Sequence, residues 1–292
     1  MLTCQAPAKI NLGLAVHARR ADGYHDISTI FLKISLADTL HFAVTTGDIV
    51  IDCEHPDIPR DKRNLIYQAA ALLQPLAPGR GVRIQLEKAI PAAAGLGGGS
   101  SDAAATLVSL NTLWDVQLSQ MQLLQYAARL GADVPFFVLP DVAALGRGRG
   151  DELETVRCTP TFFLVLVKPS IAVSTAWAYN QFRFELTGKT KDTTILRQCL
   201  ESGDIAGLGA ACVNDLETVV LPHCPKVQAV KQALRQPGTY GVSMSGSGPT
   251  VYALCRSQEI AHRVAKTVRH RGWDTWICRP WQTSGSHAMH QG

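Results

Sequence analysis

One glycine-rich stretch, residues 90–105, constrains the fold of this chain more than any other. It has four glycines within positions 95–99, followed by Ser100, Ser101 and an alanine-rich run. Residues 82–88 alternate apolar and polar side chains, as a half-buried strand does. The stretch therefore predicts a strand, a glycine loop and a helix that starts at the two serines.

A loop of this kind suits a phosphate group. Glycines allow positive φ angles and a close approach of the backbone to a ligand. The free N–H groups and the positive dipole end of the helix attract an anion. An ordinary glycine turn before a serine-capped helix is the alternative. The stretch lacks the Gly-Lys-Ser/Thr ending of a Walker loop, and its spacing does not fit the opening turn of a dinucleotide-binding fold.

Length and composition indicate one large or two modest domains. The chain has 292 residues, of which 46% are hydrophobic and 18% charged. The net charge of +4 is mild and the basic residues are scattered, so we expect neither nucleic acid nor a membrane as a partner.

We find no signal-peptide pattern and no apolar run of the roughly 20 residues that span a membrane. A cytoplasmic protein is expected.

The eight cysteines do not form a metal-binding or disulfide pattern. None stands in a C-x-x-C pair or has a histidine at zinc-finger spacing. We interpret most of them as small buried side chains in a reducing compartment. The sequence predicts no metal ligand.

Two polar residues interrupt an apolar strand predicted for residues 1–17. They are Lys9 and Asn11. A buried lysine is costly unless it is paired, although Lys9 could also extend to solvent from a strand edge. An Asp-Gly turn follows, with Tyr24 and His25 at its exit. These two side chains are either ordinary surface residues or ligand contacts.

A carboxylate, Asp133, stands between a helix stop at Gly131 and an apolar run that begins with Val134. Binding of local backbone N–H groups is the simplest interpretation of it. Residues 143–150 are rich in glycine and arginine, so we expect a flexible basic segment and a domain boundary there.

Apolar periodicity predicts the remaining elements of an α+β fold. Expected strands cover residues 27–31, 39–44, 49–51, 162–167, 251–255 and 275–278. Expected helices cover residues 64–73, 102–113, 119–130, 174–182, 195–200, 204–214, 226–236 and 258–271. We expect a second small-residue loop at 241–250, a polar linker at 187–194 and a disordered tail at 283–292.

Five segments together resemble a known family. Residues 7–12 (Pro-Ala-Lys-Ile-Asn-Leu), 91–101 and 241–248 are similar to the three motifs of the GHMP small-molecule kinases, in the same order. Residues 20–25 (Arg-Ala-Asp-Gly-Tyr-His) and 131–136 (Gly-Ala-Asp-Val-Pro-Phe) resemble members that act on a cytidine-diphosphate methylerythritol. The resemblance covers nearly the whole chain.

The resemblance implies a two-domain fold with the active site in the cleft between the domains. Residues 1–155 would form the N-terminal ATP-binding domain, similar to domain 2 of ribosomal protein S5. Residues 156–282 would form a ferredoxin-like α/β sandwich. The implied reaction transfers the ATP γ-phosphoryl group to the 2-hydroxyl of 4-diphosphocytidyl-2-C-methyl-D-erythritol, giving the 2-phosphate and ADP, in the non-mevalonate route to isoprenoid precursors.

The resemblance also implies roles for individual residues. Lys9 and Asp133 would be the catalytic pair: Asp133 accepts or orients the hydroxyl proton, and Lys9 holds it ionised and steadies the transferring charge. Asn11 would contact the substrate near the reacting hydroxyl. The cytosine-binding residues would be Tyr24, His25 and, as a second aromatic side chain, Tyr179. The ATP-binding residues would be Asn64, Leu65, Lys88, Pro91, Ala92, Ala93, Ala94, Gly95, Leu96, Gly97, Gly98, Gly99, Ser100 and Ser101.

Mg²⁺ is expected with ATP, held by phosphates, waters and the hydroxyl of Ser100 or Ser101. Two other functions stay open. One is a GHMP kinase for homoserine, mevalonate or a sugar, although those acceptors carry no base for the Tyr24–His25 turn to bind. The other is a non-catalytic nucleic-acid binder, since the N-terminal half would share its fold with a ribosomal protein. The small-molecule substrate would be bound by a monomer or a homodimer.

Overall fold

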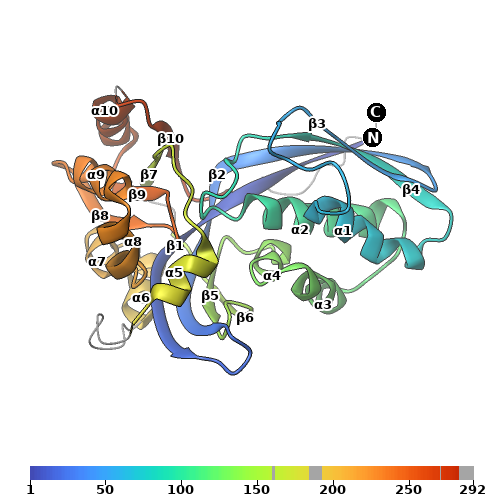
Figure 1. Cartoon of the computed structure of the whole chain (residues 1–292), viewed down its shortest axis with the longest axis horizontal. Coiled ribbons are helices and arrows are strands. Elements are labelled where there is room, and N and C mark those ends of the chain that lie inside the picture. The colour runs from blue at the N-terminus through green and yellow to red at the C-terminus, as the bar shows by residue number, and fades with distance from the viewer. Residues whose placement is uncertain (160–161, 184–192, 270, 283–292) are drawn as a thin grey trace.

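The computed structural model describes residues 1–159, 162–183, 193–269 and 271–282. Two lobes, each built on one β-sheet, lie side by side (Figure 1). The strands of the first sheet are β1 (Leu2–Arg19), β2 (His25–Thr46), β3 (Ile49–Cys53), β4 (Arg80–Glu87), β5 (Ala143–Arg147) and β6 (Glu152–Val156). The helices of this lobe are α1 (Leu65–Leu73), α2 (Gly98–Leu113), α3 (Gln120–Leu130) and α4 (Val134–Val138), with a 3₁₀ turn, η1 (Gln74–Leu76), after α1.

The second lobe has a four-stranded antiparallel sheet with the strand order β10-β7-β9-β8. Its strands are β7 (Phe163–Lys168), β8 (Thr239–Met244), β9 (Val251–Cys255) and β10 (Asp274–Cys278). This order is the one expected of a ferredoxin-like sandwich. Its helices are α5 (Thr175–Gln181), α6 (Thr193–Ser202), α7 (Ile205–Ala211), α8 (Glu217–His223), α9 (Pro225–Leu234) and α10 (Gln258–Arg269).

The first sheet is organised around the 22-residue strand β2. Along the sheet the order is β3-β4-β2-β5-β6, and β1 pairs antiparallel with β2 over most of its length. The prediction of two separate strands at 27–31 and 39–44 is wrong, because both segments belong to β2. Buried Lys33 and Asp38 break the alternation inside one continuous strand, and both find hydrogen-bond partners outside it.

The sequence predicted the starts of α3 and α1 to within one residue and the start of α2 to within two. Ser119 caps α3 with a complete capping box, in which its hydroxyl accepts from the Gln122 N–H and the Gln122 side chain accepts from the Ser119 N–H. Asn64 caps α1 through its side-chain oxygen. The helix after the glycine loop begins at Gly98, two residues before the predicted start, with Gly97 as its N-cap.

Two other expectations need correction. Residues 143–147 are strand β5, paired with β2 and β6, rather than part of a flexible segment. The predicted loop at 241–250 begins as strand β8, so the loop proper covers residues 245–250. Helix α8 was not predicted. Most of the linker at 187–194, and the tail at 283–292, lie outside the described residues.

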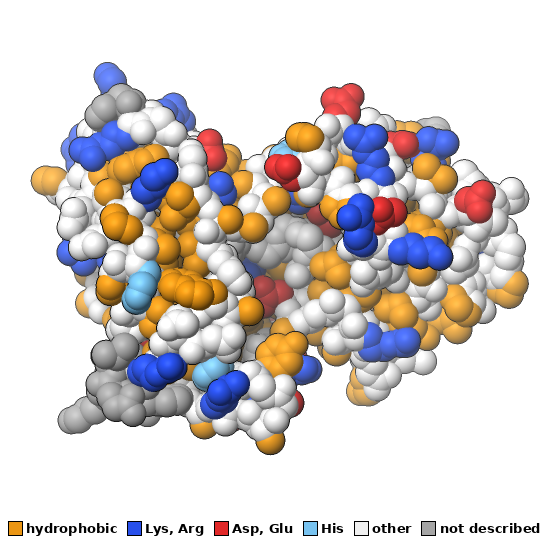
Figure 2. All heavy atoms as spheres, in the orientation of Figure 1, with side chains coloured by type: hydrophobic (Ala, Val, Ile, Leu, Met, Phe, Trp, Pro, Cys, Tyr) orange, Lys and Arg blue, Asp and Glu red, His pale blue; other side chains and the backbone are white. Residues whose placement is uncertain are grey.

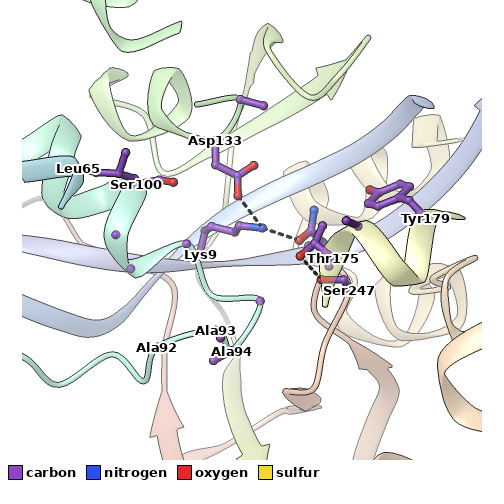
Figure 3. A pocket seen from close by; sticks show the side chains of 18 of the residues that line it. Lys9, Leu65, Ala92, Ala93, Ala94, Ser100, Asp133, Thr175, Tyr179 and Ser247 are labelled. Carbon is purple, nitrogen blue, oxygen red and sulfur yellow. Dashed lines mark hydrogen bonds and ion pairs between the residues drawn. The ribbon is translucent and has the colours of Figure 1, made fainter. Parts of the chain in front are cut away.

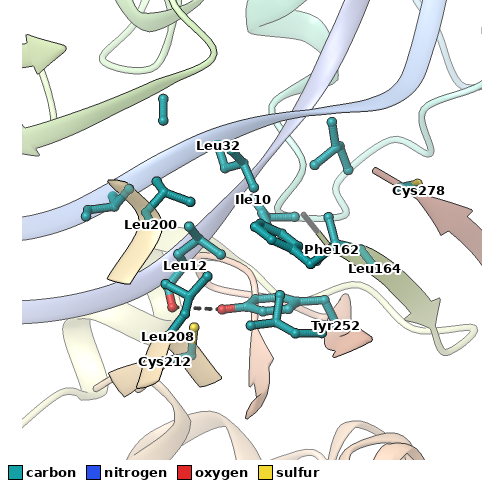
Figure 4. Close-up of a cluster of buried hydrophobic side chains, with 14 of the residues drawn as sticks. Ile10, Leu12, Leu32, Phe162, Leu164, Leu200, Leu208, Cys212, Tyr252 and Cys278 are labelled. Carbon is teal, nitrogen blue, oxygen red and sulfur yellow. Dashed lines mark hydrogen bonds between the residues drawn. The ribbon is translucent and has the colours of Figure 1, made fainter. Parts of the chain in front are cut away.

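Strand β1 joins the two lobes. One buried cluster combines Ile10 and Leu12 of β1 with side chains of the second lobe, among them Leu164 and Tyr252 (Figure 4). The Tyr252 hydroxyl donates to the Leu12 carbonyl oxygen at 2.8 Å. Backbone bonds between Leu14 and the segment at 213–215 add a further connection. Continuous burial across the joint fixes the lobes relative to each other.

The surface is hollowed between the lobes, and acidic side chains are visible in the hollow (Figure 2).

Among the described residues, no helix has both the length and the apolar composition of a membrane span.

Candidate active site

A cleft of about 980 Å³ lies between the two lobes. Its wall combines the turn between β1 and β2, the glycine loop, the start of α4, helix α5 and the 245–250 loop. Eighteen of the twenty predicted site residues line it: Lys9, Asn11, Tyr24, His25, Asn64, Leu65, Lys88, Pro91, Ala92, Ala93, Ala94, Gly95, Gly97, Gly98, Gly99, Ser100, Asp133 and Tyr179.

The other two predicted residues point into the protein. Leu96 is buried in the joint core, and its carbonyl oxygen accepts the Lys9 backbone N–H at 2.9 Å. The buried Ser101 hydroxyl donates to the Pro7 carbonyl oxygen at 2.7 Å. Leu96 and Ser101 therefore fasten the loop to β1 instead of facing a ligand, which the one-dimensional motif could not distinguish.

Lys9 and Asp133 meet at the centre of the cleft (Figure 3). The Lys9 Nζ lies 3.3 Å from the Asp133 Oδ2, and the two side chains are 6% and 34% exposed. Lys9 is thus a buried, paired lysine and does not extend to solvent. Asp133 is the N-cap residue of α4 but makes no side-chain capping bond there, so its carboxylate is available to the cleft.

A chain of three hydrogen bonds holds the Lys9 ammonium in its orientation. It donates to Asn11 Oδ1 at 2.8 Å, and Asn11 Nδ2 donates to Thr29 Oγ1 at 2.9 Å. Thr29 in turn donates to the Gly13 carbonyl oxygen at 2.5 Å. Asn11, expected near the substrate, therefore also holds Lys9 in place. Thr29 was missed because a threonine in a strand carries no signal of such a role.

The glycine loop delivers the N-terminus of α2 to the cleft. Gly97, the N-cap residue, has a φ of +69°, and a Cβ there would lie 2.9 Å from the Phe137 ring and 3.1 Å from the Lys9 side chain. The first intrahelical bond runs from the Ser101 N–H to the Gly97 oxygen. The N–H groups of residues 98–100 therefore precede the helical ladder, as an anion site requires.

An aromatic and imidazole group lies at the other end of the cleft. The His25 and Tyr179 rings are 5.5 Å apart with a 30° tilt. Burial, with a smaller contribution from the Arg19 charge, lowers the pKa of His25, so its imidazole is neutral at pH 7. Burial and then the Asp133 charge raise the pKa of Tyr179. Tyr24 is 56% exposed and carries the Arg149 guanidinium 5.4 Å from its ring centre.

Contacts from the second lobe complete the wall. Gly246 and Ser247 line the cleft, as expected for the 241–248 motif. The Ser247 hydroxyl lies 2.8 Å from the Thr175 hydroxyl at the start of α5 (Figure 3). Thr175 and Arg149 are cleft residues that the sequence did not reveal, because neither belongs to a recognisable motif.

Three predicted nucleotide neighbours are already engaged within the protein or carry no polar side chain. Asn64 uses its amide to cap α1 and to donate to the Pro59 oxygen at 2.7 Å. Leu65 is the first residue of α1. The Lys88 ammonium lies between the carboxylates of Asp38 and Asp102. Within the described parts of the chain, no group of three or more His, Cys, Asp or Glu side chains could hold a metal ion.

Comparison with known proteins agrees with this geometry. Residues 64–140 match the model of the GHMP kinase N-terminal domain, and residues 196–272 match the GHMP kinase C-terminal domain. The 4-diphosphocytidyl-2-C-methyl-D-erythritol kinase of Pelotomaculum thermopropionicum is 43% identical over 279 residues, which cover 95% of this chain and 96% of that protein.

Solved structures agree as well. A crystal structure of 4-(cytidine 5'-diphospho)-2C-methyl-D-erythritol kinase superposes with a TM-score of 0.81 at 36% identity and covers 96% of this chain and 100% of that one. A homoserine kinase from Cytophaga hutchinsonii reaches a TM-score of 0.75 at 21% identity, covering 96% and 94% of the two chains, and so shares the fold.

The fold and the cleft define a GHMP kinase. Within that class, the chain belongs to the 4-diphosphocytidyl-2-C-methyl-D-erythritol kinase family.

Proposed function

We propose that this protein transfers the ATP γ-phosphoryl group to the 2-hydroxyl of 4-diphosphocytidyl-2-C-methyl-D-erythritol. The observation that carries the proposal is the Lys9–Asp133 pair, which lies in one cleft with both the glycine loop and the Tyr24–His25 turn. A phosphate donor and an acceptor that carries a base would meet at the pair. Family membership supports the same acceptor.

The donor would bind at the glycine loop. The N–H groups of residues 98–100 and the α2 dipole suit the ATP phosphates, and Ser100 lines the cleft beside them. Asn64 and Leu65 at the start of α1, with Lys88, are proposed to border the adenosine. Mg²⁺ would neutralise phosphate charge when bound with ATP.

The acceptor would bind with its cytosine at the turn between β1 and β2. A neutral His25 imidazole can both donate and accept a hydrogen bond, which matches the polar edge of cytosine. The rings of His25 and Tyr179 are in contact, so a base would stack on the outside of this pair rather than between the two rings. The methylerythritol would then extend toward Asn11 and Asp133.

The chemical step would depend on positioning and charge. Asp133 accepts the proton of the attacking 2-hydroxyl, and the oxygen forms a bond to the γ-phosphorus as the bond to the ADP oxygen breaks. The Lys9 ammonium, held by Asn11, pairs with the Asp133 carboxylate and stabilises negative charge on the transferring group. Burial of the Lys9 side chain strengthens both interactions.

An assay with a panel of acceptors tests this function. The purified protein should convert ATP and the cytidylyl substrate to ADP and a 2-phosphate, which phosphorus NMR identifies. Homoserine, mevalonate and galactose should give no more than background turnover. Turnover of one of these acceptors, with none of the cytidylyl substrate, would contradict the proposal.

A further inference from the structure

Three charged side chains form a buried cluster beneath the glycine loop. Asp38 lies in β2 and is fully buried, Lys88 follows β4, and Asp102 lies in the first half of α2. The Lys88 Nζ donates to Asp38 Oδ2 and lies 3.0 Å from Asp102 Oδ2. The cluster therefore links a central strand, the segment before the loop and the helix after it.

Asp38 binds the chain where it leaves the sheet. Its Oδ1 accepts the backbone N–H groups of Ala89 at 2.7 Å and Ile90 at 2.8 Å. These are the last two residues before the loop begins at Pro91. One carboxylate thus fixes the direction in which the loop starts, and through Lys88 it is connected to the helix in which the loop ends.

Packing alone does not account for these charges. Removing ionised groups from water costs several kcal/mol for each ion, and apolar side chains of similar volume often fill such a site more stably. Burial raises the pKa of Asp102, against the opposing charge of Lys88, and its Oδ1 has no hydrogen-bond partner. A costly cluster directly under a ligand loop indicates a role in placing that loop.

We propose that Asp38 is a positioning residue for the nucleotide: through Ala89, Ile90, Lys88 and Asp102 it sets both ends of the glycine loop, so that the α2 N-terminus faces the ATP phosphates. In this arrangement two of the three Lys88 N–H donors serve the two carboxylates. Lys88 then acts on ATP mainly through the loop geometry. The inference rests on the proposed binding of ATP at this loop.

Nucleotide affinity and amide exchange test the inference. Asp38→Ala removes every contact of the carboxylate, whereas Asp38→Asn keeps an acceptor for the two N–H groups and loses the charge. We expect Asp38→Ala to weaken calorimetric binding of a non-hydrolysable ATP analogue by about tenfold, with the KM of the acceptor within about twofold of the wild type. The amides of Ala89 and Ile90 should exchange faster with solvent. Asp38→Asn should fall between the two proteins.

A matched control is Asp52→Ala. Asp52 forms an exposed ion pair with Arg83 at 2.7 Å on neighbouring strands of the same sheet, so its loss should change neither readout. Unchanged nucleotide affinity in Asp38→Ala would overturn the inference. An equal rise of the KM for ATP and the KM for the acceptor would overturn it as well. If Asp38→Ala does not fold, Asp38→Asn decides by the same criteria. A wild-type protein that binds no nucleotide would instead contradict the proposed function.

Discussion

Lys9 and Asp133 approach within 3.3 Å, although one lies in the first strand and the other precedes helix α4. Different parts of the chain hold each of the two residues in place. The Lys9 backbone donates to Leu96 and its ammonium to Asn11, while Asp133 is fixed by the short helix that it begins. The distance is thus set by several elements, as a preorganised site requires.

Replacing Asp133 with asparagine should reduce turnover without removing ATP. The amide keeps the shape of the carboxylate but cannot accept the hydroxyl proton, and general-base catalysis contributes about 10²–10⁴-fold. We therefore expect kcat to fall by about that factor, with the affinity for the ATP analogue nearly unchanged. Asp115→Asn, at the opposite end of α2 from the loop, serves as the control. Near-normal turnover of Asp133→Asn would exclude the assigned role.

His25→Ala should weaken acceptor binding more than catalysis. In the proposed binding mode its imidazole contacts the cytosine and not the reacting hydroxyl, so we expect the KM of the cytidylyl substrate to rise about tenfold, with a smaller change in kcat. Because burial lowers the pKa of His25, the wild-type KM should rise only when the pH falls below the usual range of histidine, where protonation removes the ring acceptor.

A surface histidine provides the comparison for this variant. His41 contacts Thr3 and Glu87 on the first sheet and does not line the cleft. His41→Ala should keep the wild-type KM and its pH dependence. An unchanged KM in His25→Ala would remove this side chain from the cytosine site.

Gly95→Ala should disturb the contact between the glycine loop and the second lobe. Gly95 has a φ of +76°, and a Cβ would lie 2.4 Å from the Ser245 carbonyl oxygen. We expect a loss of about 2 kcal/mol in the free energy of unfolding, from the clash and the unfavourable φ, together with weaker ATP binding. Denaturant unfolding and calorimetry measure the two effects.

Gly99→Ala, in the first turn of the adjoining helix α2, is the matched control. A Cβ there would meet only a Leu65 methyl group at 3.8 Å, and alanine favours the helix by about 1 kcal/mol. Its stability should be equal to that of the wild type or higher. Equal destabilisation by both substitutions would show that the contact with Ser245 is not the cause.

Local patterns predicted most elements because they depend on neighbouring residues. The strand, loop and helix around residues 90–105, the Ser119 cap and the second-lobe strands β7, β9 and β10 follow from such patterns. The continuity of β2 could not be predicted, because Lys33 and Asp38 have partners far along the chain: the Leu139 carbonyl oxygen and the Ala89 N–H. An alternation rule treats such buried polar residues as breaks.

The sequence predicted which residues form the site, but not the directions in which their side chains point. The motifs indicated Lys9, Asp133 and the glycine loop, and all of these meet in one cleft. The motifs did not show that Leu96 and Ser101 face inward, since a loop that turns at Gly97 directs neighbouring side chains to opposite sides. Nor did they show the hydrogen bond from Asn11 to Thr29, because that bond depends on the register of β1 against β2.

Lys33 should make the stability of the protein depend on pH. Its ammonium is buried, donates to the Leu139 oxygen at the end of α4 and lies 5.2 Å from the centre of the Phe136 ring. Burial lowers the pKa of Lys33 from 10.5 to about 8, partly offset by the Asp141 charge. This difference corresponds to about 3 kcal/mol of lost stability at neutral pH.

Proton binding by Lys33 differs between the native and the unfolded chain. Between pH 8 and 10.5 the unfolded chain holds a proton that the native Lys33 has released, so the contribution of this group to stability increases with pH in that window. Below pH 8 the penalty is fully present. Lys33→Met removes the titrating group but also loses the bond to Leu139, worth about 1 kcal/mol. We expect the variant to be about 2 kcal/mol more stable at pH 7 and to lose that advantage by about pH 10.

Urea unfolding of both proteins at pH 7 and pH 10 measures the difference. Other lysines and tyrosines titrate at high pH, but they do so in both proteins and cancel in the comparison. Lys231→Met is the contrasting variant, because Lys231 is paired with Glu217 and its loss leaves a largely buried carboxylate unpaired. That variant should be less stable than the wild type at both pH values. A Lys33→Met protein that is destabilised equally at pH 7 and pH 10 would show that Lys33 does not titrate near pH 8.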